Sequence, residues 1–155
     1  MTQPDPPRLV FRHLDDEPWR EVKAQRHGER RVSIWEKWLD RSPRLLALYA
    51  RYDPGMVVER HGHLSDHLVF VLEGEVTIGE RRCPAGTHVT LEQGATFGPI
   101  VAGPDGAVLY EVMMGDPRAV PADPDEFRAL CAARGVEPLP NPPLLRPSGA
   151  KPRLD

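Results

Sequence analysis

The sequence predicts an all-β fold, a sandwich or barrel of short antiparallel strands, followed by one helix. The main observation is that apolar runs rich in β-branched residues recur along residues 45–114, with turn-forming residues between them at regular intervals. A second observation is that residues 123–135 carry the start and stop signals of a helix, which the earlier part of the chain lacks. These patterns predict a β domain with one helix after it.

The strands can be placed by the turns that separate them. Residues 32–39 alternate loosely, and the turn sequence at 40–43 leads into the apolar run 45–52, which predicts a hairpin. Residues 68–72 are Leu-Val-Phe-Val-Leu and predict a short buried strand of their own. Further turns are expected at 53–55, 79–81, 84–86, 92–94 and 104–106.

One helix is expected after the strands. Asp123 is a good N-cap, Pro124 suits the first turn, Phe127 and Leu130 share a face, and Gly135 is a typical terminator.

The domain organisation follows the proline distribution. The chain has 155 residues and 18 prolines, which cluster at both ends. Proline-rich segments cannot pair as central strands. We expect an N-terminal arm (1–30) carrying Trp19, a β-barrel domain (31–118), and a C-terminal helix with a Pro-rich tail (119–155).

Composition narrows the partners and the compartment. The formal charge is −3, and lysines and arginines are scattered among acidic residues, so we expect neither nucleic acid nor a membrane surface as a partner. The N-terminal residues lack the pattern of a secretory signal, and no apolar run has membrane-spanning length. Cys83 and Cys131 form no disulfide framework. A cytoplasmic location is therefore expected.

The candidate site is a cluster of histidines. Three of the six histidines, His61, His63 and His67, lie within a few residues of one another. His61 and His63 are separated by one residue, so on a strand both imidazoles point to the same face and can bind one ion. Because residues 68–72 are predicted to be a separate strand, His67 is expected to arrive from the start of that neighbouring strand.

The spacing around these histidines resembles the first motif of the cupin family. Cupins have Gly, five residues, His-x-His, three or four residues, Glu, six residues and Gly. The chain has Gly55, five residues, His61-x-His63, three residues, His67, six residues and Gly74. Every spacing agrees, and His67 stands where the family has its glutamate.

The second cupin motif is matched more weakly. It begins with Pro-x-Gly, which resembles residues 84–86, and it ends on a metal-binding histidine whose place is taken here by Phe97. The resemblance covers roughly residues 45–114 and implies a double-stranded β-helix (cupin or jelly-roll barrel) with one divalent metal. The implied ligands are His61, His63 and His67.

The departures from the family pattern bear on the metal. Imidazole ligands suit transition metals but do not rank them. The resemblance to cupin dioxygenases with three-histidine iron sites implies iron as the first choice, with zinc, nickel, copper, cobalt and manganese as alternatives. A histidine in place of the carboxylate removes one negative charge, and Phe97 supplies no fourth ligand. Both features predict an open site that attracts anionic oxygen donors. A degenerate cupin without metal is the alternative.

Further residues are candidates for catalysis or for the substrate pocket. Glu59 shares the parity of the histidines and is a candidate base, and His88 is a second. Each is equally explained as a solvent-exposed residue. Phe97, Tyr49 and Tyr110 are candidate pocket residues, and the two tyrosines are equally explained as core.

Two function classes remain open. One is a metal-dependent enzyme, by resemblance a dioxygenase and thus an oxidoreductase, acting on a small organic acid or diketone; an isomerase or lyase is a variant of this class. The other is a small-molecule-binding or sensor cupin without catalysis. An enzyme needs a titratable group beside the bound substrate, whereas a binder needs only a shaped cavity.

Assembly is predicted from residues 68–72. Large apolar side chains occupy both parities there, so one set faces the interior and the other must be covered by the N-terminal arm, the helix or a second chain. We expect a homodimer.

Overall fold

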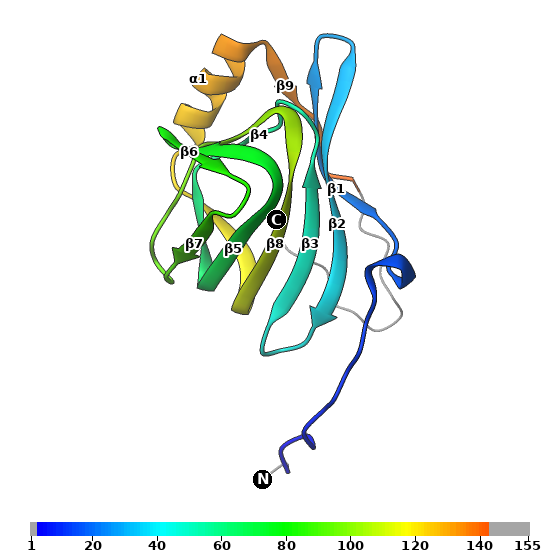
Figure 1. The fold of residues 1–155 in the computed structure, drawn as a ribbon. Coiled ribbons are helices and arrows are strands. Elements are labelled where there is room, and N and C mark those ends of the chain that lie inside the picture. Colours follow the sequence, from blue (N-terminus) through cyan, green and yellow to red (C-terminus); the bar gives the residue numbers. More distant parts are fainter. Residues whose placement is uncertain (1–2, 143–155) are drawn as a thin grey trace.

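The computed structural model describes residues 3–142, and most of its regular structure belongs to one antiparallel sheet that curls around a core (Figure 1). The strands are β1 (Arg20–His27), β2 (Arg30–Arg41), β3 (Leu46–Tyr52), β4 (Val57–Val58), β5 (His61–Ile78), β6 (Arg81–Pro84), β7 (His88–Leu91), β8 (Ile100–Pro121) and β9 (Val136–Pro138). A short 3-10 turn, η1 (Leu14–Asp16), precedes them, and α1 (Pro124–Arg134) is the α-helix of the described residues. The all-β prediction with one helix is confirmed.

The sheet has the order β6-β5-β8-β3-β2-β1-β9, with β7 paired to β5 and β4 paired to β8. The predicted hairpin is present, because β2 and β3 pair antiparallel around residues 42–45. Its two strands are amphipathic, and inward residues such as Ile34, Leu48 and Ala50 join the main core.

Two strands are much longer than the sequence suggests. β5 has 18 residues and β8 has 22, and they pair with each other along most of their length. Of the expected turns, only the one at 104–106 falls inside a long strand, β8, while those at 53–55, 79–81, 84–86 and 92–94 lie between strands or at strand ends. The pairing of β5 with β8 shifts register at three places. At one bend Gly74 has a φ of +65°, and a Cβ there would lie 2.1 Å from the carbonyl oxygen of Gly106. Glycine is therefore required for the strands to cross so closely.

The sheet extends beyond both limits predicted for the barrel. Residues 20–27, expected in the N-terminal arm, form β1, which pairs with β2 on one side and with β9 on the other. β8 continues to Pro121, past the expected end at 118. β1 was not predicted as a strand because many of its residues are charged and its buried and exposed positions alternate only in part.

Helix α1 forms as its sequence predicts. The Asp123 side chain accepts hydrogen bonds from the backbone N–H groups of Asp125 and Glu126, and Gly135 ends the helix in the left-handed region with a φ of 66°. Cys131 of α1 is buried in a small cluster with Val57 and Val136, which fixes the helix to β4 and β9. No helix within residues 3–142 is long and apolar enough to span a membrane.

Candidate functional site

The three histidines lie on the inner face of one strand. His61, His63 and His67 all belong to β5 and have the same parity, and the inward series continues with Val69 and Val71. The expectation that His67 comes from a neighbouring strand is therefore wrong. No local pattern indicated that residues 61–78 form one uninterrupted strand.

Bending of β5 brings the three rings together. The ring centroids of His61 and His63 are 5.1 Å apart, and those of His63 and His67 are 4.5 Å apart. Residues four apart on a straight strand are separated by about 13 Å. A register shift after His63 provides the local irregularity, since Leu64 pairs with Asp116 while His63 pairs with Ala119.

Backbone carbonyl groups orient the first two imidazoles. The Nδ1–H of His61 donates to the carbonyl oxygen of Glu59 at 2.7 Å, and that of His63 donates to the carbonyl oxygen of Pro117 at 3.0 Å. Pro117 lies in the bulged part of β8. Because a carbonyl can only accept, the proton sits on Nδ1, and Nε2 of each neutral ring keeps its lone pair.

A carboxylate orients the third imidazole. Nε2 of His67 lies 3.1 Å from Oε1 of Glu111, and both side chains are buried, with exposed fractions of 2% and 9%. When Glu111 is ionised, His67 donates from Nε2, and its Nδ1 keeps the lone pair. Each histidine thus has one nitrogen anchored and one nitrogen free.

Burial keeps two of these imidazoles neutral. Desolvation is the largest cause that lowers the pKa of His61, with a smaller contribution from the positive charge of Lys23. Desolvation also lowers the pKa of His63, to about 4, and the neighbouring His67 and His61 add to the effect. At neutral pH both rings are therefore in the state that can bind a metal.

The unbonded imidazole nitrogens of the cluster have the chemistry that a metal ligand requires. Nε2 of His63 and Nδ1 of His67 are buried and have no hydrogen-bond partner in the structure. Histidines that bind metals usually donate their second nitrogen to a carbonyl or a carboxylate, as all three do here. Within residues 3–142, however, no three His, Cys, Asp or Glu side chains already converge as a metal-binding group. Ligation would require the rings to adjust.

A cavity of about 80 Å³ opens beside His61 and His63. Charged and polar groups from four strands and the loop before β5 also line it: Lys23, Glu36, Tyr52, Glu59 and Glu111. Glu36 is buried and accepts a hydrogen bond from the Trp38 indole at 2.8 Å. A protein interior with this many ionisable groups is unusual for a purely structural core.

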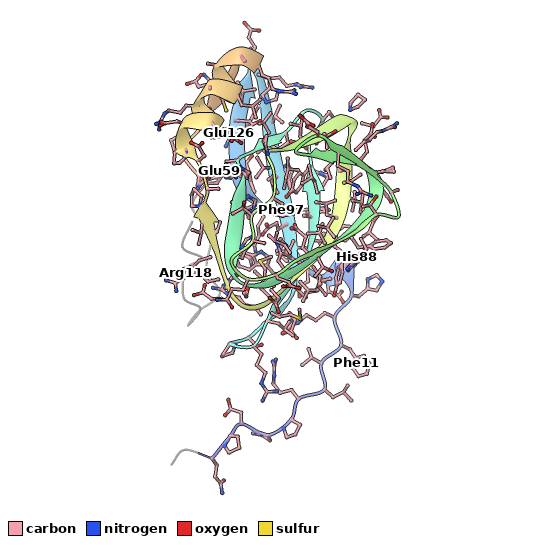
Figure 2. All side chains as sticks on the ribbon, turned by 90° about the vertical axis from the view of Figure 1, so that its left-hand side faces the viewer. Phe11, Glu59, His88, Phe97, Arg118 and Glu126 are labelled. Carbon is pink, nitrogen blue, oxygen red and sulfur yellow. The ribbon has the colours of Figure 1, made fainter. Side chains whose placement is uncertain are left out.

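Phe97 closes one side of the histidine cluster. Its backbone exchanges two hydrogen bonds with His61, both 3.0 Å. Its ring centroid is 5.2 Å from that of His61 and 5.7 Å from that of His67, and it lies inside the barrel (Figure 2). Phe97 thus packs directly against the imidazoles of His61 and His67.

Three candidate residues lie elsewhere. His88 is exposed on β7, where it hydrogen-bonds the Thr90 hydroxyl at 2.8 Å and points away from the interior (Figure 2). Tyr49 and Tyr110 are paired neighbours on the outer face of β3 and β8, and Tyr110 is 39% exposed. The structure therefore corrects their assignment as a base and as pocket residues. Their parity is opposite to that of inward residues such as Leu109 and Glu111.

Glu59 does line the cavity, and the sequence analysis missed two further acids. Glu111 sits between Leu109 and Met113 in the inward series of β8, and Glu36 follows Ile34 in that of β2. An acid at an inward position of an apolar strand was the available signal. Glu36 and Glu111 could be recognised as inward-facing acids only once the structure showed which residues of each strand face the core.

A small double-stranded β-helix barrel that holds its candidate site inside, on a strand bearing several histidines, is a cupin. A sequence profile of the ChrR cupin-like domain family matches residues 9–114, and the chain belongs to that family. No curated protein is significantly similar in sequence.

Solved structures are similar to this chain over most of its length. KdgF from Halomonas sp. is 25% identical, with a TM-score of 0.54, and the match covers 76% of this chain and 99% of KdgF. An acetylacetone dioxygenase from Acinetobacter johnsonii is 13% identical, with a TM-score of 0.61 and coverage of 81% and 85%. One chain in the structure of Rhodobacter sphaeroides SigE in complex with the anti-sigma ChrR is 22% identical, with a TM-score of 0.51. The match covers 66% of this chain and 52% of that chain. The latter two show a common fold.

Proposed function

We propose that the chain is a metal-binding cupin in which His61, His63 and His67 hold one divalent transition metal, with iron as the first choice. The observation that supports this is the anchoring of one nitrogen on each ring, to Glu59, Pro117 and Glu111, while the other nitrogen stays free. Zinc, nickel, copper, cobalt and manganese remain alternatives, because imidazole ligands do not distinguish among them.

The proposed activity is that of a dioxygenase-like enzyme acting on a small organic acid or diketone. A bound ion would supply Lewis acidity and, if redox-active, the chemistry of oxygen activation. The chain's own residues contribute in other ways. Phe97 excludes water from one side of the imidazoles, Lys23 places a positive charge near His61 that favours an anionic ligand, and the carboxylate of Glu59 is available as a proton acceptor.

A second candidate is a sensor or binding cupin without turnover, and the family membership favours it. The related ChrR occurs in a complex with SigE, so a protein partner is part of this alternative. A metal-dependent isomerase or lyase would use the same site without oxygen.

Oxygen uptake separates these functions. Iron-loaded protein is mixed with acetylacetone or a small 2-oxo acid in an oxygen electrode, beside His63→Ala and the matched control His88→Ala, whose histidine is exposed on the neighbouring strand. The dioxygenase proposal predicts uptake by the wild type and the control, but not by His63→Ala. Iron-loaded protein that binds these compounds without consuming oxygen contradicts it and favours the binding module.

A homodimer and a cytoplasmic location also belong to the proposal. Exposed apolar side chains on the outer faces of β5 and β8 support the homodimer, since such patches are seldom left uncovered. Both cysteines are free and buried, which agrees with a reducing compartment. A monomeric mass by light scattering at micromolar concentration would contradict the homodimer.

A further inference from the structure

The N-terminal tail, residues 3–13, carries large apolar side chains that are exposed to solvent. Leu9 is 83% exposed, Phe11 is 87% exposed and Val10 is 43% exposed. The tail leaves the barrel below the β2–β3 hairpin and runs away from it (Figure 1). The match to the family profile begins at residue 9, so Leu9, Val10 and Phe11 fall within the family domain. Apolar residues this exposed call for a covering surface.

A surface of the right chemistry lies on the outside of the sheet. The outer apolar face consists of Leu68, Phe70, Leu72, Tyr110, Val112 and Met114. Four of its members are 38–47% exposed, and the pairs Phe70–Tyr110 and Leu68–Val112 are direct neighbours across β5 and β8. Cross-strand neighbours make this a continuous patch.

The root of the tail already touches the edge of this face. The Trp19 ring lies 5.7 Å from that of Tyr49, the β3 neighbour of Tyr110. The Lys37 ammonium donates to the carbonyl oxygen of Leu14 at 2.7 Å. The part of the chain that follows the tail therefore covers the β2–β3 side of the face and leaves the β5–β8 side bare.

The tail of the same chain is held away from the bare part. On one side of Leu9–Phe11, Arg8 pairs with Asp40 of β2 at 3.6 Å, and on the other side Leu14 is bound to Lys37 of β2. β3 and β8 lie between β2 and β5 in the sheet, so these attachments are about 14 Å from β5 at roughly 4.8 Å per strand. Phe11 lies below the barrel (Figure 2).

We propose that the N-terminal tail of one copy packs on the outer apolar face of a second copy, so that the chain forms a two-fold homodimer with exchanged tails. In a two-fold dimer whose outer faces oppose each other, each tail emerges beside the partner's bare strands. Leu9 and Phe11 then cover Phe70 and Tyr110 in trans. The interface is independent of the metal site, since the face points away from the interior.

The first test compares dimer dissociation constants by sedimentation velocity. Phe11→Asp places a charge in the proposed contact, and Met114→Asp does the same from the face. Ala133→Asp adds the same charge to an exposed position of α1, away from the face. Both contact variants are expected to weaken the dimer at least tenfold, with thermal unfolding showing that they fold, while the control remains wild-type. A monomeric wild type, or a Phe11→Asp dimer of unchanged affinity, overturns the proposal.

The second test distinguishes exchange from folding back. A chain with the photo-crosslinker p-benzoylphenylalanine at position 11 is mixed with ¹⁵N-labelled unmodified chain, irradiated and digested. The proposal predicts cross-links from light position 11 to heavy peptides containing residues 64–72 or 108–114. Cross-links confined to light peptides of the same chain, or to heavy peptides elsewhere, overturn it.

Discussion

Replacing Glu111 with glutamine tests the role of the carboxylate that orients His67. Glutamine keeps the size of the side chain but removes its charge, so the proton on Nε2 of His67 loses its ionised acceptor 3.1 Å away. The pair is buried, with exposed fractions of 2% and 9%, so water does not replace the lost interaction. The same site departs from the cupin pattern by having His67 in place of a carboxylate ligand, and Glu111 returns a negative charge beside it.

The expected loss follows from this geometry. Removing a carboxylate partner of a metal-bound histidine typically costs 10- to 100-fold in affinity, or about 1.4–2.7 kcal/mol. Burial places Glu111→Gln toward the upper end of this range. An exposed pair would contribute only about 0–1 kcal/mol.

The assay is a competition titration with a metal chelator, using zinc or cobalt as the probe metal. Glu36→Gln is the matched control, because Glu36 lines the same cavity and is similarly buried, but it accepts a hydrogen bond from the Trp38 indole. The reasoning predicts weaker binding for Glu111→Gln and little change for Glu36→Gln. Equal affinities for Glu111→Gln and the wild type, or equal losses in the two variants, would refute it.

Three other predictions concern the site and the fold. Phe97→His, which places a nitrogen among the rings at 5.2–5.7 Å, should slow metal release and weaken ligand binding; unchanged release and ligand affinity would show that residue 97 does not face the ion. In metal-free protein, His63 has a pKa of about 4 in the folded state and 6.5 in the unfolded state. Between these pH values the unfolded chain binds a proton that the folded chain does not bind. The free energy of unfolding therefore falls by about 3 kcal/mol as the pH drops from 6.5 to 4. Urea melts should show a smaller loss over that window for His63→Gln, and an identical loss would disprove the assignment. Asp123→Ala removes the cap of α1 and should cost about 1 kcal/mol in a thermal melt, with no effect on metal affinity.

The sequence was sufficient for features fixed by local chemistry. Capping by Asp123 and termination at Gly135 depend on neighbouring residues, and the β2–β3 hairpin depends on its own turn, so all three could be read from the chain. The parity of His61 and His63 was equally local. The resemblance to cupins added the inward placement of Phe97.

The features that could not be predicted depend on long-range pairing. β5 remains one strand through Gly74 because β8 pairs with it along its length, and this contact is distant in sequence. His67 therefore lies on the same strand as His61 and His63. Glu111 meets His67 for the same reason, across 44 residues of sequence. His88, Tyr49 and Tyr110 were misplaced because their face depends on the same register.

The metal content of the purified protein decides whether His61, His63 and His67 bind a transition metal. The chain is expressed without added metal and analysed by inductively coupled plasma mass spectrometry, beside the triple variant with alanine at His61, His63 and His67 and beside the control His88→Ala. The account predicts about one transition-metal ion per chain in the wild type and in the control, and almost none in the folded triple variant. Equal metal content in the wild type and the triple variant, or a wild type that binds no metal even after loading, would contradict it.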